Sequence, residues 1–210
     1  MIDTLVNNPF LFVLSAVSIV IAITVHEYAH AKTADHLGDP TPGLQGRLTL
    51  NPLAHLDVYG TLFLLLFGFG WGKPVQFDPF NLKHPRKDAA IISVAGPLSN
   101  FFLAIVCSVA IRLFMLFQLP EVAAIGSMYL APFIFMNLIL GIFNLIPIHP
   151  LDGFKIVGGL LSEQQAKEWY QLEKFGIIFL LLLIFPFPSG SMLHKILDPI
   201  VSFLYQLLIP

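Results

Sequence analysis

Three stretches of the chain are apolar for long enough to cross a lipid bilayer as helices. They cover residues 9–31, 89–117 and about 129–148. A helix of roughly 20 residues spans the ~30 Å hydrocarbon core of a membrane. Only 11% of the residues are charged, whereas soluble domains carry roughly a quarter. So few charges cannot cover a water-exposed surface, so we expect lipid to be the solvent for much of this protein.

The remaining segments complete the expected fold, an all-α membrane protein whose polytopic helix bundle has three core spans. Residues 32–58 are rich in glycine and proline, which predicts short strands and turns. Residues 59–71 are apolar but short, as in a re-entrant segment. Residues 175–210 are again apolar, which predicts a further C-terminal span or two. We expect a single integral-membrane domain over residues 1–210, with a core at 9–155 and a C-terminal membrane segment at 175–210.

The positions of the basic residues predict the orientation of a multi-pass protein in the cell membrane. Nine of the eleven lysines and arginines lie in residues 32–58, 72–88 and 153–174. Basic residues favour the cytoplasmic side. The first and the third span then both end on the cytoplasmic side. Side chains at these two ends therefore meet at similar depth, nearer the cytoplasm.

A His-Glu-x-x-His motif lies at the end of the first stretch, in His26-Glu27-Tyr28-Ala29-His30. On a helix, residues four apart share one face, so His26 and His30 can bind the same metal ion. Glu27 lies beside them, near enough to take a proton from water. Zinc suits this pattern, because it lowers the pKa of a bound water to about 7. The other reading is a hydrogen-bonded cluster at a helix end, but ionisable residues inside a membrane helix are costly and usually functional.

A catalytic zinc usually has three protein ligands, and Asp152 offers the third. It follows Pro147 and Pro150, which break the helix and free backbone groups that membrane proteins tolerate where they line a cavity. On its own, Asp152 could equally be the capping residue of an ordinary turn. The orientation of the spans brings it to the depth of the histidines, which favours a metal ligand.

Five sequence motifs occur in order between about residues 20 and 155. They are His26-Glu27-Tyr28-Ala29-His30, the stretch from Gly46 to Asp57, Gly72-Lys73-Pro74-Val75, Ala95-Gly96-Pro97-Leu98-Ser99-Asn100, and the stretch from Asn144 to Gly153. With these motifs the chain resembles the site-2 protease family of intramembrane zinc metalloproteases, in its compact prokaryotic form without a PDZ or CBS domain. The resemblance implies one zinc ion held by His26, His30 and Asp152, with Glu27 as general base. It also implies that Asn144 hydrogen-bonds the substrate or the developing oxyanion.

The resemblance implies substrates that are transmembrane helices of other membrane proteins, cut within or near the bilayer. Residues 43–50 could accept an unwound substrate by strand addition. The net charge of −2 gives no indication of nucleic-acid binding, and the sequence specifies no oligomeric state. Two alternatives remain open: a membrane metal-ion transporter that uses the histidines as a transit site, and a non-catalytic scaffold that binds membrane helices.

Four further polar residues have weaker indications. His149 stands where the family often has proline, and we assign it no role. His55 and Asp57 could bind metal, but their turn-rich surroundings favour local hydrogen bonds. Asn100 lies within the second span, where an amide is expected to bond across helices.

Overall fold

The computed structural model describes residues 2–67, 70–185 and 191–209. Within these residues the regular elements are all helical. They are α1 (Ile2–Asn7), α2 (Pro9–His36), α3 (Thr41–Leu44), α4 (Val58–Phe67), α5 (Pro85–Leu116), α6 (Pro120–Asn144), α7 (Asp152–Leu160), α8 (Glu163–Tyr170), α9 (Gly176–Ile184) and α10 (Met192–Leu208), with short 3-10 helices η1 (Pro52–Ala54), η2 (Pro79–Asn81) and η3 (Gln171–Phe175).

Helix α2 begins and ends where its sequence supplies capping residues. The Asn8 side chain accepts a hydrogen bond from the Leu11 backbone N–H (3.0 Å), which satisfies one free donor of the first turn. Pro9 takes the first helical position, where its missing N–H costs nothing. After the helix the chain turns at Gly38, whose φ of +102° suits glycine. The helix therefore runs for 28 residues, about 42 Å at 1.5 Å per residue.

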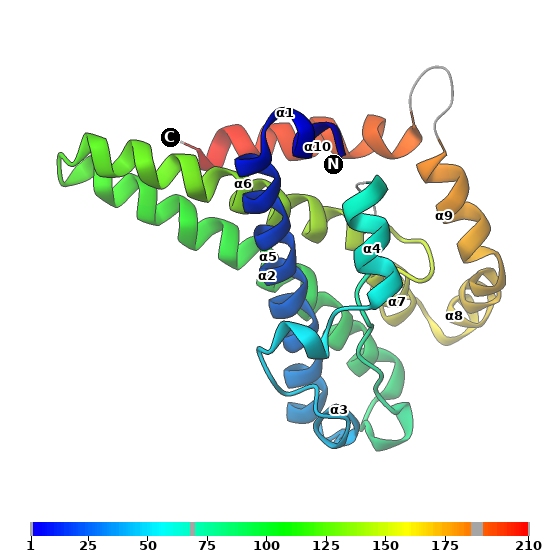
Figure 1. The fold of residues 1–210 in the computed structure, drawn as a ribbon. Coiled ribbons are helices and arrows are strands. Elements are labelled where there is room, and N and C mark those ends of the chain that lie inside the picture. Colours follow the sequence, from blue (N-terminus) through cyan, green and yellow to red (C-terminus); the bar gives the residue numbers. More distant parts are fainter. Residues whose placement is uncertain (1, 68–69, 186–190, 210) are drawn as a thin grey trace.

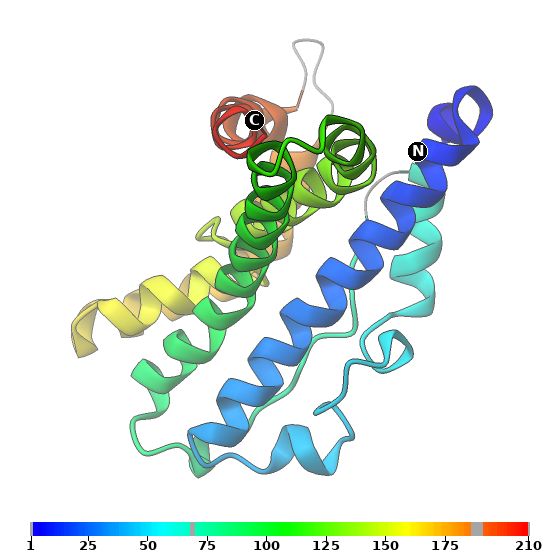
Figure 2. The same cartoon turned by 90° about the vertical axis from the view of Figure 1, so that its left-hand side faces the viewer.

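Among the described residues, three helices are long and apolar enough to cross a membrane: α2, α5 and α6. Helix α5 lies at the centre, because it packs against α2, α6 and α7. Figure 1 shows α5 and α6 side by side with α2 crossing them, and Figure 2 shows the same helices from the side. The prediction of an all-helical membrane protein with three core spans is confirmed at this level. The third helix begins earlier than predicted, because Pro120 supplies a favourable first position.

Helix α10 packs along the second half of α6. Leu197 and Val201 of α10 are buried in one apolar cluster with Leu138 and Ile142 of α6. In both views α10 lies at the end of the molecule where α1 and the start of α2 lie, and α3 lies at the opposite end (Figure 1, Figure 2). The C-terminal helices thus add a further layer to the bundle of α2, α5 and α6.

The prediction of short strands in residues 32–58 is wrong. No strand occurs among the described residues, and residues 43–50 form the end of α3 followed by turns. Pro42 lies in the first turn of α3, where its fixed φ favours a helix. Gly46 then reverses the chain at a φ of +68°. Residues 43–50 consequently offer no extended edge for the strand addition that the sequence suggested.

The elements on either side of the long helices are too short to be counted as spans. Helix α4 has 10 residues, about 15 Å in length, which fits a segment that enters the membrane without crossing it. Helices α9 and α10 have 9 and 17 residues and also fall short of a span. Pro186, Pro188 and Gly190, which the sequence suggests as the break in the C-terminal segment, lie outside the described residues.

Candidate metal centre

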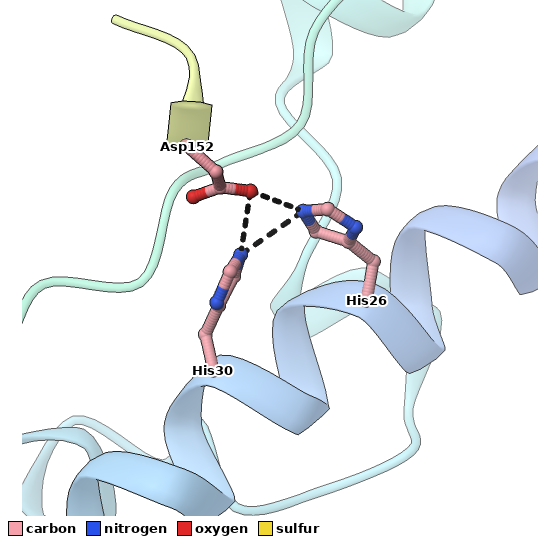
Figure 3. Close-up of side chains that lie close together, drawn as sticks. All are labelled: His26, His30 and Asp152. Carbon is pink, nitrogen blue, oxygen red and sulfur yellow. Dashed lines mark hydrogen bonds and ion pairs between the residues drawn. The ribbon is translucent and has the colours of Figure 1, made fainter. Parts of the chain in front are cut away.

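The side chains of His26, His30 and Asp152 meet at one point. His26 and His30 lie one turn apart on α2, and Asp152 is the first residue of α7. The two Nε2 atoms are 3.0 Å apart, and Asp152 Oδ2 lies 3.1 Å from His26 Nε2 and 3.2 Å from His30 Nε2. Figure 3 shows the three side chains converging from the two helices. The ligand atoms of this cluster all lie within 4.8 Å of one another, as a shared metal ion requires.

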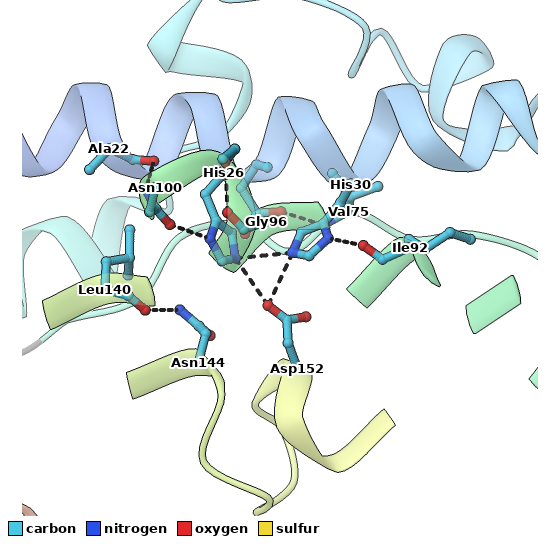
Figure 4. A network of polar contacts seen from close by, with 12 residues as sticks. Ala22, His26, His30, Val75, Ile92, Gly96, Asn100, Leu140, Asn144 and Asp152 are labelled. Atoms are coloured by element: carbon cyan, nitrogen blue, oxygen red, sulfur yellow. Dashed lines mark hydrogen bonds and ion pairs between the residues drawn. The ribbon is translucent and has the colours of Figure 1, made fainter. Parts of the chain in front are cut away.

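Hydrogen bonds on the outer side of each imidazole fix its tautomer. His30 Nδ1 donates to the Ile92 carbonyl oxygen (2.7 Å). Asn100 Nδ2 donates to the carbonyl oxygen of Ala22 and to Asn137 Oδ1, so its Oδ1 must accept from His26 Nδ1 (2.7 Å). Both Nδ1 atoms are therefore protonated, as Figure 4 allows the reader to follow. Each Nε2 then directs a lone pair toward the centre.

These tautomers make the cluster a fit for a cation. Two imidazole lone pairs and a carboxylate oxygen face one another at about 3 Å, and without positive charge such groups repel. Nitrogen and oxygen donors of this kind suit zinc, which takes two histidines and a carboxylate in catalytic sites. The outer partners orient the ligands in the way that metal sites commonly use. The donor set therefore fits the predicted zinc ion.

Gly96 of α5 leaves room at the point of convergence. A Cβ atom on this residue would lie 2.5 Å from His30 Nε2 and 2.6 Å from His26 Nε2. Any side chain there would occupy the space between the two ligand atoms. The sequence analysis noted Gly96 only as part of a motif. Its role depends on how α5 packs against α2, which the sequence does not reveal.

Glu27 is held by the segment that follows α4. Its Oε2 accepts a hydrogen bond from the Val75 backbone N–H (2.9 Å), and Val75 itself is buried. The other oxygen, Oε1, lies near Gly72, where a Cβ atom would be 3.8 Å away. One carboxylate oxygen thus has a fixed partner while the carboxylate still lines the cavity beside the metal cluster. This arrangement fixes the orientation of the Glu27 carboxylate at the cavity wall.

Arg47 connects the two loops that position this segment. Its guanidinium is buried and donates to the carbonyl oxygens of Ala54 and Lys73. The Lys73 N–H in turn donates to the His55 carbonyl oxygen (2.7 Å). Burial lowers the pKa of the guanidinium, and the nearby Glu27 carboxylate opposes that shift. Arg47 therefore fixes residues 73–75, which hold Glu27.

A cavity of about 1010 Å³ opens onto the metal cluster. Side chains from α2, α6, α7 and α10 line it together with residues 70–77. Asn144 lies on its wall at the end of α6, and its Nδ2 donates one hydrogen bond to the Leu140 carbonyl oxygen (3.0 Å). No described residue accepts the second amide hydrogen. Asn144 thus stands beside the cluster with a donor available, as Figure 4 shows.

The weaker predictions have mixed outcomes. Asn100 bonds across helices as expected, and its function of orienting His26 was missed because it depends on packing. His55 and Asp57 make the expected local hydrogen bonds, to the Thr49 carbonyl oxygen and from the Gly60 N–H respectively. His149 lies 3.7 Å from Glu173 and outside the metal cluster.

Comparison with known proteins agrees with this geometry. The model of a family described as peptidase family M50 matches residues 113–185. The chain is 37% identical over 177 residues to the Bacillus subtilis protein YwhC, named a "putative zinc metalloprotease", with 82% of this chain and 81% of YwhC covered. The chain belongs to peptidase family M50. The expected membership of the site-2 protease family and the expected zinc metalloprotease activity are thereby confirmed.

Two further relatives carry similar names. Rip2 of Mycobacterium tuberculosis, also named a "putative zinc metalloprotease", is 30% identical over 179 residues, which cover 82% of this chain and 66% of Rip2. A zinc metalloprotease of Methanocaldococcus jannaschii, MJ0392, is 34% identical over 82 residues, covering 39% of this chain and 22% of that protein. No solved structure matches the peptidase significantly.

Proposed function

We propose that the peptidase uses His26, His30 and Asp152 as zinc ligands and Glu27 as general base. The observation that carries this assignment is the convergence of two Nε2 lone pairs and one carboxylate oxygen at about 3 Å. Outer hydrogen bonds fix both imidazoles in the tautomer that ligation needs. A bound zinc ion would supply an acidified water and polarise the scissile carbonyl.

Glu27 would act as the general base and then as the general acid of the reaction. Its Oε2 stays on the Val75 N–H, and its Oε1 takes the proton of the attacking water. The same carboxyl group then gives that proton to the leaving amine nitrogen. Asn144, with its free amide hydrogen at the cavity wall, would donate to the oxyanion that develops at the cleaved carbonyl.

The substrates would be transmembrane segments of other membrane proteins. The cavity beside the cluster is lined by residues of the three candidate spans α2, α5 and α6, so the scissile bond would be cut at membrane depth. The excess of basic residues in 32–58, 72–88 and 153–174 supports an active site nearer the cytoplasmic side. Within a single membrane domain, α4 would be re-entrant, and the apolar α9 and amphipathic α10 would be the C-terminal membrane segment.

Co-expression of the peptidase with candidate single-pass membrane proteins tests this function. Wild-type protein should shorten a substrate, whereas Glu27→Gln protein should bind one zinc ion per chain and leave the substrate intact. Glu121→Gln is a matched control, because Glu121 is an exposed glutamate at the start of α6 and should tolerate the change. Equal cleavage by the wild-type and Glu27→Gln proteins would refute the mechanism.

A further inference from the structure

Helix α10 presents a row of polar side chains to the active-site cavity. His194, Asp198 and Ser202 are spaced four residues apart, so they lie on one face of the helix. All three line the cavity that opens onto the metal cluster. We name these three residues the α10 stripe. The rest of the wall is largely aliphatic and aromatic, and the three polar side chains are exposed beside it.

The α10 stripe offers both hydrogen-bond donors and acceptors. Ser191 Oγ accepts from the His194 backbone N–H (3.2 Å), so its own hydrogen is free to donate to His194 Nδ1 (2.5 Å). In the tautomer in which Ser191 donates, His194 Nε2 carries the ring proton and is a donor, and in the other tautomer it is an acceptor. Asp198 is an acceptor with no ion pair to any described basic residue. Ser202 can act either way, so both kinds of group face the cavity.

Helix α10 packs against α6, and α6 in turn supports the metal centre. Leu197 and Val201, on the packed side of α10, are buried against Leu138 and Ile142 of α6. The neighbouring residue of α6, Asn137, accepts a hydrogen bond from Asn100, which in turn orients the first zinc ligand. Helix α10 is therefore seated on the part of α6 that supports the metal centre, and its polar face opens into the same space.

We propose that the α10 stripe binds the backbone N–H and C=O groups of the substrate segment while it is unwound. The inference rests on the proposed function, because a helical substrate must open before its peptide bond can be attacked. Each backbone group released from a helix into apolar surroundings costs several kcal/mol if it stays unpaired. The donors and acceptors on α10 match the two kinds of backbone group that unwinding releases. Such recognition would not depend on the side chains of the substrate.

Two model substrates test the inference in proteoliposomes that contain the full-length zinc-bound protein. The first is a 20-residue leucine-alanine membrane segment, and the second is the same segment with a Gly-Pro pair at its centre, which opens the helix in advance. Variants Asp198→Leu and His194→Leu should lose about 3- to 10-fold in kcat/KM on the continuous helix, the scale of one net hydrogen bond. On the interrupted helix each variant should lose less than about 2-fold.

Four further proteins make the outcome interpretable. Gln206→Leu removes a polar group from the same row of α10 outside the cavity, and it should cleave both substrates at the wild-type rate. Asp198→Asn keeps an acceptor without the charge, so it should behave like wild type even if Asp198→Leu does not fold. Comparison of the wild-type and Glu27→Gln proteins establishes that cleavage depends on Glu27.

Several results would overturn the inference. Equal losses of kcat/KM on both substrates would mean that the stripe only stabilises the fold. Unchanged kcat/KM on both substrates would mean that the stripe does not contribute to cleavage. A loss in Asp198→Asn would mean that charge is recognised instead of the backbone. If wild-type protein cleaves neither substrate in a Glu27-dependent manner, the proposed function fails and this inference fails with it.

Discussion

Replacing Gly96 by alanine should disable the metal centre without changing any ligand. The added Cβ would lie 2.5 Å from His30 Nε2 and 2.6 Å from His26 Nε2, whereas non-bonded heavy atoms prefer about 3.5 Å or more. Relief requires α5 to move away from α2 by about 1 Å. That movement stretches the 2.7 Å bonds from His26 Nδ1 to Asn100 and from His30 Nδ1 to Ile92 beyond hydrogen-bonding distance.

The expected losses follow from these two effects. Removing the outer partner of one ligand commonly lowers metal affinity by about 10- to 100-fold. Gly96→Ala disturbs two such partners and also fills the space between the ligands. We therefore expect zinc affinity to fall by at least ~100-fold, measured by competition with a chelator of known affinity. Peptide-bond cleavage should fall in parallel, and overpacking should cost about 1–3 kcal/mol of stability.

Gly126→Ala provides the matched control for this experiment. Gly126 also lies in a long membrane helix, α6, but its Cβ would meet Phe114 carbons at 3.6 and 3.7 Å, which is ordinary contact. This variant should bind zinc and unfold like wild type. Gly96→Ala protein that holds one zinc ion per chain with unchanged affinity would refute the proposed placement of the metal between α2 and α7, beside Gly96 of α5.

Three further changes test the supports of the site. Asn100→Leu should lower zinc affinity by about 10- to 100-fold, because His26 loses the partner that fixes its tautomer; unchanged affinity in chelator competition would contradict this. Arg47→Met should lower kcat with zinc content retained, since the segment that holds Glu27 loses its anchor; a loss of zinc instead would make Arg47 a general structural residue. Asp39 is buried, which raises its pKa, but hydrogen bonds from Thr41, Asn81 and Asp78 outweigh burial and hold the pKa below its usual range. Its stabilising contribution should be complete above the unfolded-state pKa of about 3.9 and disappear as pH falls through the lower folded pKa. Asp39→Asn should cost about 1–3 kcal/mol at pH 7 and flatten the acid limb of thermal unfolding scans from pH 7 to 3; a parallel shift at every pH would disprove the assignment.

Sequence patterns selected three side chains that the structure brings together. The four-residue spacing of His26 and His30 placed them on one face of a helix, and the distribution of basic residues brought Asp152 to the same depth. Both indications depend on helix geometry and on the bilayer, which constrain a membrane protein strongly. The structure accordingly brings together the three side chains that the sequence selected.

Contacts that depend on packing between distant segments were not predictable in the same way. Asn100 was expected to bond across helices, but nothing in its neighbours identifies His26 as the partner. The strands expected near Gly46 failed for a related reason. A glycine- and proline-rich stretch is compatible with strands or with turns, and here Pro42 lies in the first turn of a short helix and Gly46 in a turn at positive φ.

The bond between Glu27 and the Val75 N–H also matters for inhibition. The carboxylate depends on a short non-helical stretch, which Arg47 secures from outside the membrane helices. A compound that displaces residues 73–75 would misalign Glu27, the proposed base, without touching the proposed metal site. Such a compound would not need a metal-chelating group.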